Sequence, residues 1–212
     1  MKQYLIEKGI EESKIFELEL FDYICKGNVE KKIIGIDSIP TIVYAGNLSK
    51  QKSPFIHSID YNKINFKFKL YGIGFNEKEN EKLEYCGSFS PEELPNNLNG
   101  SIGLVWDGSL DESDENNGFK RYTRYNNPHK LSCYIAAGLP VIVWSKSAIS
   151  EFVIKNNIGY TIDNIYDINN IDFSDYEIKK ANVNKFMARV RVGYYTKKVI
   201  NEIKKEVNKY ND

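Results

Sequence analysis

The apolar residues of this chain fall into short runs separated by polar segments. Continuous runs of about four to eight apolar residues indicate buried strands, whereas apolar residues three and four apart indicate helices. Strands are expected at residues 15–21, 39–46, 66–71, 84–89, 102–106, 139–144 and 159–162. Helices are expected at residues 2–8, 128–138 and 147–155, from Pro91 onward, and from residue 174 to the C-terminus, and residues 46–52 are expected to form a turn.

Strands and helices alternate from residue 41 to residue 162, which predicts an α/β fold with a Rossmann-like parallel sheet and helices on both faces. The run at 102–106 is wholly apolar and predicts a central strand. The run at 66–71 alternates with lysine and predicts a strand nearer an edge. In such sheets ligands bind at the carboxyl ends of the strands, so the loops there should converge on one crevice suited to a nucleotide.

The first helix and strand, within residues 2–21, have no earlier strand to pair with and cannot close a core alone. We therefore expect residues 1–38 to be the remnant of a truncated N-terminal domain plus a linker. Residues 39–212 are expected to form one complete domain with helices at its C-terminal end.

Composition restricts the function without identifying it. The 29 Lys and Arg residues balance the 29 Asp and Glu residues, so no overall charge points to nucleic acid or a membrane surface. No apolar run approaches the roughly 20 residues of a membrane span, and no signal peptide is visible, so a cytoplasmic location is expected. The three isolated cysteines indicate reduced thiols, and two histidines cannot build a histidine metal cluster.

The most informative stretch is residues 126–144, N-N-P-H-K-L-S-C-Y-I-A-A-G-L-P-V-I-V-W. It predicts a polar loop, a short helix with Asn127 as its N-cap and Pro128 at its first position, a stop at Gly138, and a strand. The backbone N–H groups that open the helix, together with Lys130, would form a seat for an anion.

This stretch, followed by a second helix from Ser147, resembles the C-terminal half of two-domain glycosyltransferases of the GT-B type. It is most similar to the bacterial branch that contains the glucosyltransferases extending O-linked GlcNAc on serine-rich-repeat adhesins and galactofuranosyltransferase-like enzymes. The resemblance implies that residues 39–212 bind the donor, a UDP-sugar, and that residues 1–38 remain from an acceptor domain. It further implies transfer of a hexose, glucose or galactose, to a glycan or glycoprotein, with no metal and no other cofactor.

The resemblance also implies roles for two residues of the central motif. Asn127 and Lys130 match the N-x-x-K that contacts the diphosphate in similar enzymes. Lys130 would then stabilise the negative charge that accumulates on the leaving UDP. The alternative for Lys130 is an ordinary surface lysine.

Further candidates follow the expected strands. Phe89 matches a position that is often aromatic and close to the uracil, and its alternative is a core phenylalanine. Gly46, Asn47 and Lys50 match a glycine-containing turn where phosphate or sugar approaches, although the basic residue there is either Lys50 or Lys52.

The remaining polar residues near the expected crevice carry two interpretations each. Asp107 either holds a sugar hydroxyl or caps its loop, and Arg121 and Arg124 either reach phosphate or stay solvated. Tyr44 and Trp106 lie in buried strands and are interpreted as core residues, and His129 as a local hydrogen-bonding residue. The acidic residues Asp111, Glu112, Asp114 and Glu115 indicate a solvated loop rather than a metal site, because no D-x-D pair is present.

The catalytic base of such an enzyme is expected in the missing domain, so the isolated chain should be weakly active or inactive. Its partners would be a nucleotide sugar, the acceptor, and either a companion N-terminal domain or a second copy of the chain. The alternative function is a non-catalytic accessory subunit that keeps the fold. A Rossmann dehydrogenase is disfavoured because no G-x-G-x-x-G follows the first strand of the domain.

Overall fold

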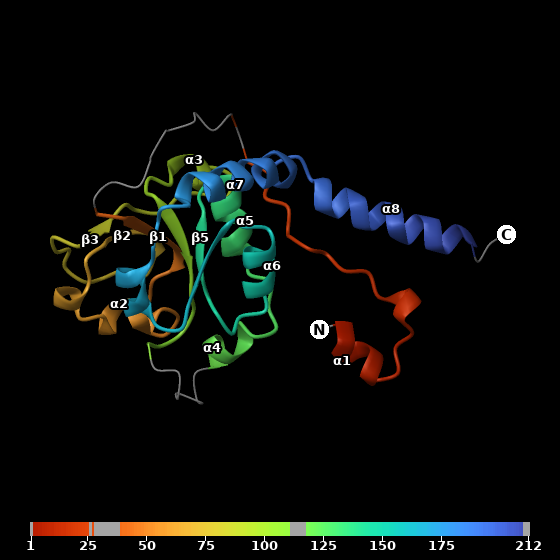
Figure 1. The fold of residues 1–212 in the computed structure, drawn as a ribbon, viewed down its shortest axis with the longest axis horizontal. Coiled ribbons are helices and arrows are strands. Elements are labelled where there is room, and N and C mark those ends of the chain that lie inside the picture. Colours follow the sequence, from red (N-terminus) through yellow and green to blue (C-terminus); the bar gives the residue numbers. More distant parts are fainter. Residues whose placement is uncertain (1, 26, 28–38, 111–117, 210–212) are drawn as a thin grey trace.

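One parallel sheet organises the chain (Figure 1). The computed structural model describes residues 2–25, 27, 39–110 and 118–209. Within these ranges six strands form a sheet in the order β3-β2-β1-β4-β5-β6, with every neighbouring pair parallel. The strands are β1 (Thr41–Asn47), β2 (Lys67–Ile73), β3 (Leu83–Tyr85), β4 (Ile102–Val105), β5 (Val141–Trp144) and β6 (Gly159–Ile162). The predicted α/β class is confirmed, β4 is central, and β2 lies one strand from the edge as expected.

Helices cover both faces of the sheet. The helices of the described residues are α1 (Lys2–Glu7), α2 (Pro54–Ser58), α3 (Leu94–Asn97), α4 (Gly118–Tyr122), α5 (His129–Ala136), α6 (Ser150–Lys155), α7 (Tyr176–Val190) and α8 (Tyr194–Lys209), with the 3-10 helices η1 (Glu12–Lys14), η2 (Tyr61–Lys63) and η3 (Ile165–Asn170). Of these, α1 and α8 lie away from the sheet (Figure 1). Successive side chains of β1 point to opposite faces. Val43 and Ala45 join the core under α5, α6 and α7, whereas Ile42 and Tyr44 join the core under α2 and η3.

Residues 15–21 do not form the expected strand. They belong to an extended segment that crosses the domain surface, where Leu20 is fully buried. The main chain of this segment bonds to a helix end rather than to a strand, since the Tyr23 N–H donates to the Val190 carbonyl at 3.0 Å. Its Asp22 carboxylate accepts hydrogen bonds from the backbone N–H groups at the start of α8. An apolar run becomes a strand only beside another strand, and none of the six described strands pairs with this segment.

The turn expected to continue through residues 48–52 is confirmed, and α2 begins at Pro54. Two expected helix starts are shifted along the chain. The Ser90 hydroxyl bonds the Glu93 carboxylate rather than a backbone N–H group, so residues 90–93 stay a turn before α3. Ser147 donates to the Trp144 carbonyl at 2.6 Å, and α6 follows at Ser150. In each case a local turn hydrogen bond competes with helix nucleation.

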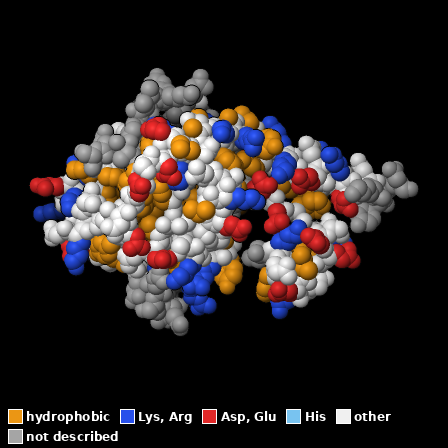
Figure 2. Space-filling view, viewed as in Figure 1, with side chains coloured by type: hydrophobic (Ala, Val, Ile, Leu, Met, Phe, Trp, Pro, Cys, Tyr) orange, Lys and Arg blue, Asp and Glu red, His pale blue; other side chains and the backbone are white. Residues whose placement is uncertain are grey.

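The boundary expected at residue 38 falls beside residues 28–38, which lie outside the described part of the chain, so the domain division stays a prediction. At the other end, α8 projects away from the sheet (Figure 1), with Ile200, Ile203 and Val207 exposed on its surface. Among the described residues no helix is long and apolar enough to cross a membrane. Figure 2 shows acidic and basic side chains intermixed over the face in view, in keeping with the balanced charge.

The contact between α5 and β4 leaves no room for a methyl group, so the variant Gly103→Ala should be destabilised. A Cβ atom there would lie 2.3 Å from the Tyr134 ring. We expect the free energy of unfolding in urea to fall by about 1–3 kcal/mol. In the control variant Gly118→Ala the described residues leave open space around the new methyl group. A loss of similar size in both variants would contradict this packing.

The buried tyrosines should make the fold sensitive to alkali. Burial raises the pKa values of Tyr44, Tyr71, Tyr134 and Tyr176. The unfolded chain releases these protons near pH ~10 while the folded chain keeps them. The contribution of these tyrosines to the free energy of unfolding is therefore fully present below about pH 10 and decreases as the pH rises further. Urea unfolding between pH 8 and pH 11 measures this loss, and a free energy of unfolding that stays constant over that range would refute it.

Candidate functional site

The sheet opens between β1 and β4, where the strand order reverses direction. The register of the two strands pairs Val43 with Gly103, and beyond this point they separate. The Ala45 N–H then donates to the Tyr134 hydroxyl of α5 at 2.8 Å instead of to a strand. An open α/β sheet binds its ligands at the carboxyl ends of the strands beside such a reversal. This opening is therefore the position where the fold favours a ligand.

The side chain of Lys130, from the first turn of α5, occupies the opening. Its ammonium donates to the Tyr44 hydroxyl of β1 at 2.9 Å and to the Trp106 carbonyl after β4 at 3.2 Å. The third donor contacts the Asp107 carboxylate in a short ion pair. The ammonium also lies 4.5 Å from the centre of the Tyr44 ring. One cation thus joins the two strands where their backbones no longer pair.

The charge of this cation is well compensated. Burial alone lowers the pKa of Lys130, but the Tyr44 oxygen and Asp107 stabilise the ammonium more strongly, and the pKa ends above its usual value. Burial also raises the pKa of Tyr44, an effect that Lys130 offsets only in part. The Ser53 hydroxyl donates to the Asn47 carbonyl and lies 2.7 Å from the Tyr44 hydroxyl. The single Tyr44 proton can thus go to Ser53, which leaves a lone pair for Lys130.

The turn after β1 completes this arrangement. Gly46 has φ +150, and a Cβ atom there would lie 3.1 Å from Cε of Lys130. Glycine therefore makes room for the lysine side chain. Asn47 is exposed, and its side-chain oxygen accepts from the Ser49 N–H at 3.0 Å, which closes the turn. Of the predicted site residues, Gly46 and Lys130 are brought into direct proximity.

Other predicted residues have different neighbours. Lys50 is 76% exposed and pairs with Glu77 at 3.2 Å, while the ammonium of Lys52 lies 3.8 Å from the centre of the Phe119 ring. Phe89 is 38% exposed, and its ring centroid lies 6.3 Å from that of Tyr71 in β2. It is therefore not a core residue, and its ring contact is with β2 rather than with Lys130.

Asn127 is not the N-cap of α5. Pro128 takes that position in an extended conformation, without a side-chain cap. The Asn127 amide instead donates to the Glu19 carbonyl of the N-terminal segment at 3.0 Å, and its side-chain oxygen is buried without a partner in the described residues. His129 stacks on Phe21 of the N-terminal segment with the ring centroids 4.3 Å apart, so the contact shown is not the local hydrogen bond that was expected. The N-terminal segment therefore contacts the side chains of both Asn127 and His129 at the start of α5.

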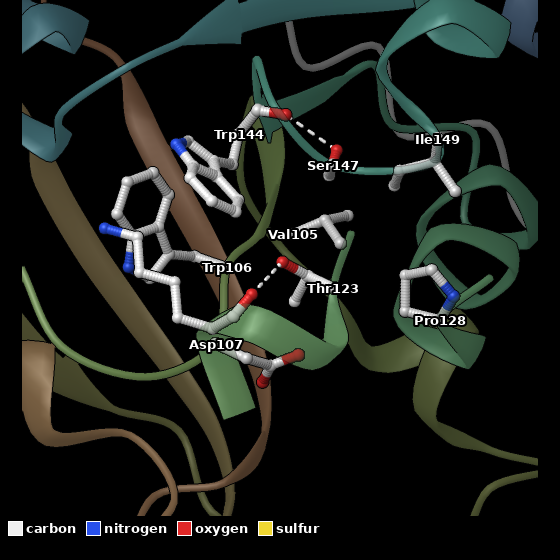
Figure 3. Close-up of a pocket in the computed structure, with 9 residues that line it drawn as sticks. Val105, Trp106, Asp107, Thr123, Pro128, Trp144, Ser147 and Ile149 are labelled. Atoms are coloured by element: carbon white, nitrogen blue, oxygen red, sulfur yellow. Dashed lines mark hydrogen bonds between the residues drawn. The ribbon is translucent and has the colours of Figure 1, made fainter. Parts of the chain in front are cut away.

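A small pocket lies beside the opening, at the carboxyl ends of β4 and β5 (Figure 3). Figure 3 shows two tryptophans on one side, Pro128 and Ile149 on the other, and Asp107 at the border. Its lining consists of Val105, Trp106, Asp107, Lys120, Thr123, Pro128, Trp144, Ser147 and Ile149. The buried Lys120 ammonium lies 4.7 and 5.1 Å from the two tryptophan rings, and Arg124 lies 5.2 Å from that of Trp144.

Metal binding finds no support in the described part of the chain, where no group of three or more His, Cys, Asp or Glu side chains converges. The acidic residues Asp111, Glu112, Asp114 and Glu115 lie outside it. The sequence pattern predicts only a core position for Tyr44 and does not indicate that its hydroxyl contacts Lys130. The available signal was its hydroxyl, because a tyrosine in a wholly buried strand must find a hydrogen-bond partner.

Comparison with known proteins identifies relatives over nearly the whole chain. The chain is 34% identical over 211 residues to beta-1,6-galactofuranosyltransferase WbbI of Escherichia coli (strain K12), and the match covers 96% of this chain and 60% of that protein. It is 26% identical over 212 residues to Glucosyltransferase 3 of Streptococcus gordonii, covering 98% of this chain and 60% of that protein. The chain thus spans about 60% of the length of these curated relatives.

Similarity to solved structures is weaker. The glycosyltransferase SnogD from Streptomyces nogalater matches with a TM-score of 0.43 and 12% identity, covering 83% of this chain and 47% of that one. The pneumococcal O-GlcNAc transferase GtfA, solved with UDP and GlcNAc, matches with a TM-score of 0.40 and 15% identity, covering 90% and 38%. Such scores add nothing to what the sheet order establishes.

The strongest assignment comes from sequence. Residues 42–203 match the family described as glucosyltransferase 3-like, C-terminal domain, a range that contains the sheet, the opening between β1 and β4, and Lys130. This chain therefore belongs to the glucosyltransferase 3-like family of glycosyltransferases and contains its C-terminal domain.

Proposed function

We propose that this chain is the donor-binding half of a UDP-sugar-dependent glycosyltransferase. It would bind the nucleotide of a UDP-hexose, glucose or galactose, for transfer to a glycan or glycoprotein acceptor in the cytoplasm. The names of its relatives, a galactofuranosyltransferase and a glucosyltransferase, support the class of reaction. The catalytic base and the acceptor site are assigned to a companion domain, so the isolated chain would transfer sugar slowly or not at all.

The observation that carries this proposal is the position of the Lys130 ammonium. It lies where the strand order reverses, and it belongs to a residue in the first turn of α5, where the backbone N–H groups of a helix start point outward. A helix start and a cation together favour a phosphate group. Lys130 would stabilise the charge that develops on the departing UDP, so the reaction would need no metal.

The neighbouring residues would complete the donor site in the proposed arrangement. Gly46 leaves the room that the Lys130 side chain needs to reach the opening, and Asn47 is exposed at the same turn. Lys50 would have to leave Glu77, and Asn127 would have to leave the Glu19 carbonyl, before either could reach the diphosphate. Phe89 is exposed enough to stack on a base, although its ring contact is with β2.

UDP should bind to the 212-residue chain, and the variant Lys130→Ala should bind it more weakly. Loss of one charged hydrogen bond costs about 1.5–3 kcal/mol, which corresponds to a roughly 10- to 150-fold weaker Kd by titration calorimetry. Lys205→Ala, on the projecting helix α8, is the matched control and should leave the Kd unchanged. The assignment fails if millimolar UDP, UDP-glucose and UDP-galactose give no heat and do not shift the melting temperature.

A second candidate function is a non-catalytic accessory subunit, which the exposed apolar face of α8 favours. In that case the chain should form a stable complex with an intact transferase or with itself and show no nucleotide affinity. Size-exclusion chromatography with light scattering would measure self-association. Replacement of Ile200 and Ile203 by serine should abolish such a complex, and a complex that survives this change would exclude the role of α8.

A further inference from the structure

The Lys130 ammonium has no spare hydrogen-bond donor in this structure. A lysine ammonium carries three N–H groups, and here they go to Tyr44, Trp106 and Asp107. A phosphate oxygen can therefore contact this group directly only if one of the three present acceptors leaves. The identity of that acceptor determines how the site opens.

Only one of the three acceptors can leave at low cost. Tyr44 is fully buried and Trp106 is 1% exposed, so water cannot replace Lys130 at either oxygen. Only the hydrogen bonds of the Tyr44 hydroxyl with Ser53 and with the Trp106 carbonyl would remain. The Asp107 side chain is 28% exposed and can be hydrated when it separates from the ammonium. Replacement of a carboxylate by a phosphate also keeps the cation next to an anion, whereas replacement of a neutral oxygen would add a second negative charge.

The surroundings of Asp107 permit this movement. It follows β4 and precedes Gly108, whose φ of +85 marks a turn outside the sheet. Its side chain lies at the border of the small pocket of Figure 3 and is 28% exposed, so the carboxylate can turn toward solvent. The backbone carbonyl of Trp106 can meanwhile keep its hydrogen bond to Lys130.

We propose that Asp107 acts as an internal substitute for the ligand phosphate. Its carboxylate holds Lys130 while the donor site is empty, the diphosphate of the nucleotide displaces it, and its return promotes release of the nucleotide. This inference rests on the proposed function, because it takes Lys130 as the diphosphate contact. Asp107 is thus a competitor that sets the affinity for the nucleotide, and it has no direct part in sugar transfer.

The test is the variant Asp107→Asn, which keeps the size of the side chain and an acceptor oxygen but removes the charge that competes. We expect UDP to bind about tenfold more tightly by titration calorimetry, because a neutral acceptor holds the ammonium less strongly. The dissociation rate of UDP, followed by stopped flow, should fall by a similar factor. The affinity for uridine, which carries no phosphate, should stay unchanged.

The matched control is Asp163→Asn, an exposed aspartate that follows β6 at the same edge of the sheet and bonds the Ser145 hydroxyl. It should leave the affinity for UDP unchanged. Melting temperatures without ligand establish that both variants fold. A general structural effect of Asp107→Asn would alter uridine and UDP binding alike, and that outcome would overturn the proposal.

The remaining outcomes separate this inference from the proposed function. If the unaltered chain binds UDP and Asp107→Asn binds it equally or more weakly, the role of Asp107 is refuted and the donor site stands. If only Asp107→Asn binds UDP measurably, the competition is supported in its strongest form. If neither binds UDP at millimolar concentration, both proposals fail, because removal of the competing charge should have exposed the site.

Discussion

The hydrogen bonds of one lysine compensate for the separation of two strands. Beyond Val43 and Gly103, β1 and β4 no longer pair, and backbone groups inside the domain need other partners. Lys130 supplies a donor to the Trp106 carbonyl, and the Tyr134 hydroxyl accepts from the strand on the other side. The protein's own groups therefore satisfy the backbone at this opening, and the Lys130 ammonium lies between the two strands.

Helix α5 fits this opening because two glycines make room for it. Lys130 and Tyr134 are four residues apart and so lie on one face of the helix. The lysine stem passes beside Gly46 of β1, and the tyrosine ring lies over Gly103 of β4. One helix face thus fills the space between the strands and also brings the positive charge to their carboxyl ends. The packing of α5 on the sheet and the placement of the Lys130 charge therefore both depend on these four residues.

Much of the fold follows from local patterns in the chain. Short apolar runs bounded by polar segments identify six of the strands, because a strand buried on both faces requires apolar side chains at successive positions. The run at 15–21 satisfies the same pattern and yet is no strand, since pairing depends on a neighbour that the run itself cannot specify. Helix starts are shifted where hydroxyls such as that of Ser147 bond to turn carbonyls.

At the site, the sequence by itself determined that Lys130 follows a helix start and that Gly46 ends a strand, because both are features of adjacent residues. The tertiary structure alone decided that these two residues meet and that Tyr44 and Asp107 share the ammonium. It also gave Asn127 to the N-terminal segment instead of the helix cap. Such contacts join residues from about 20 to more than 100 positions apart, and the strand order that brings them together depends on how the two cores pack, which no local pattern records.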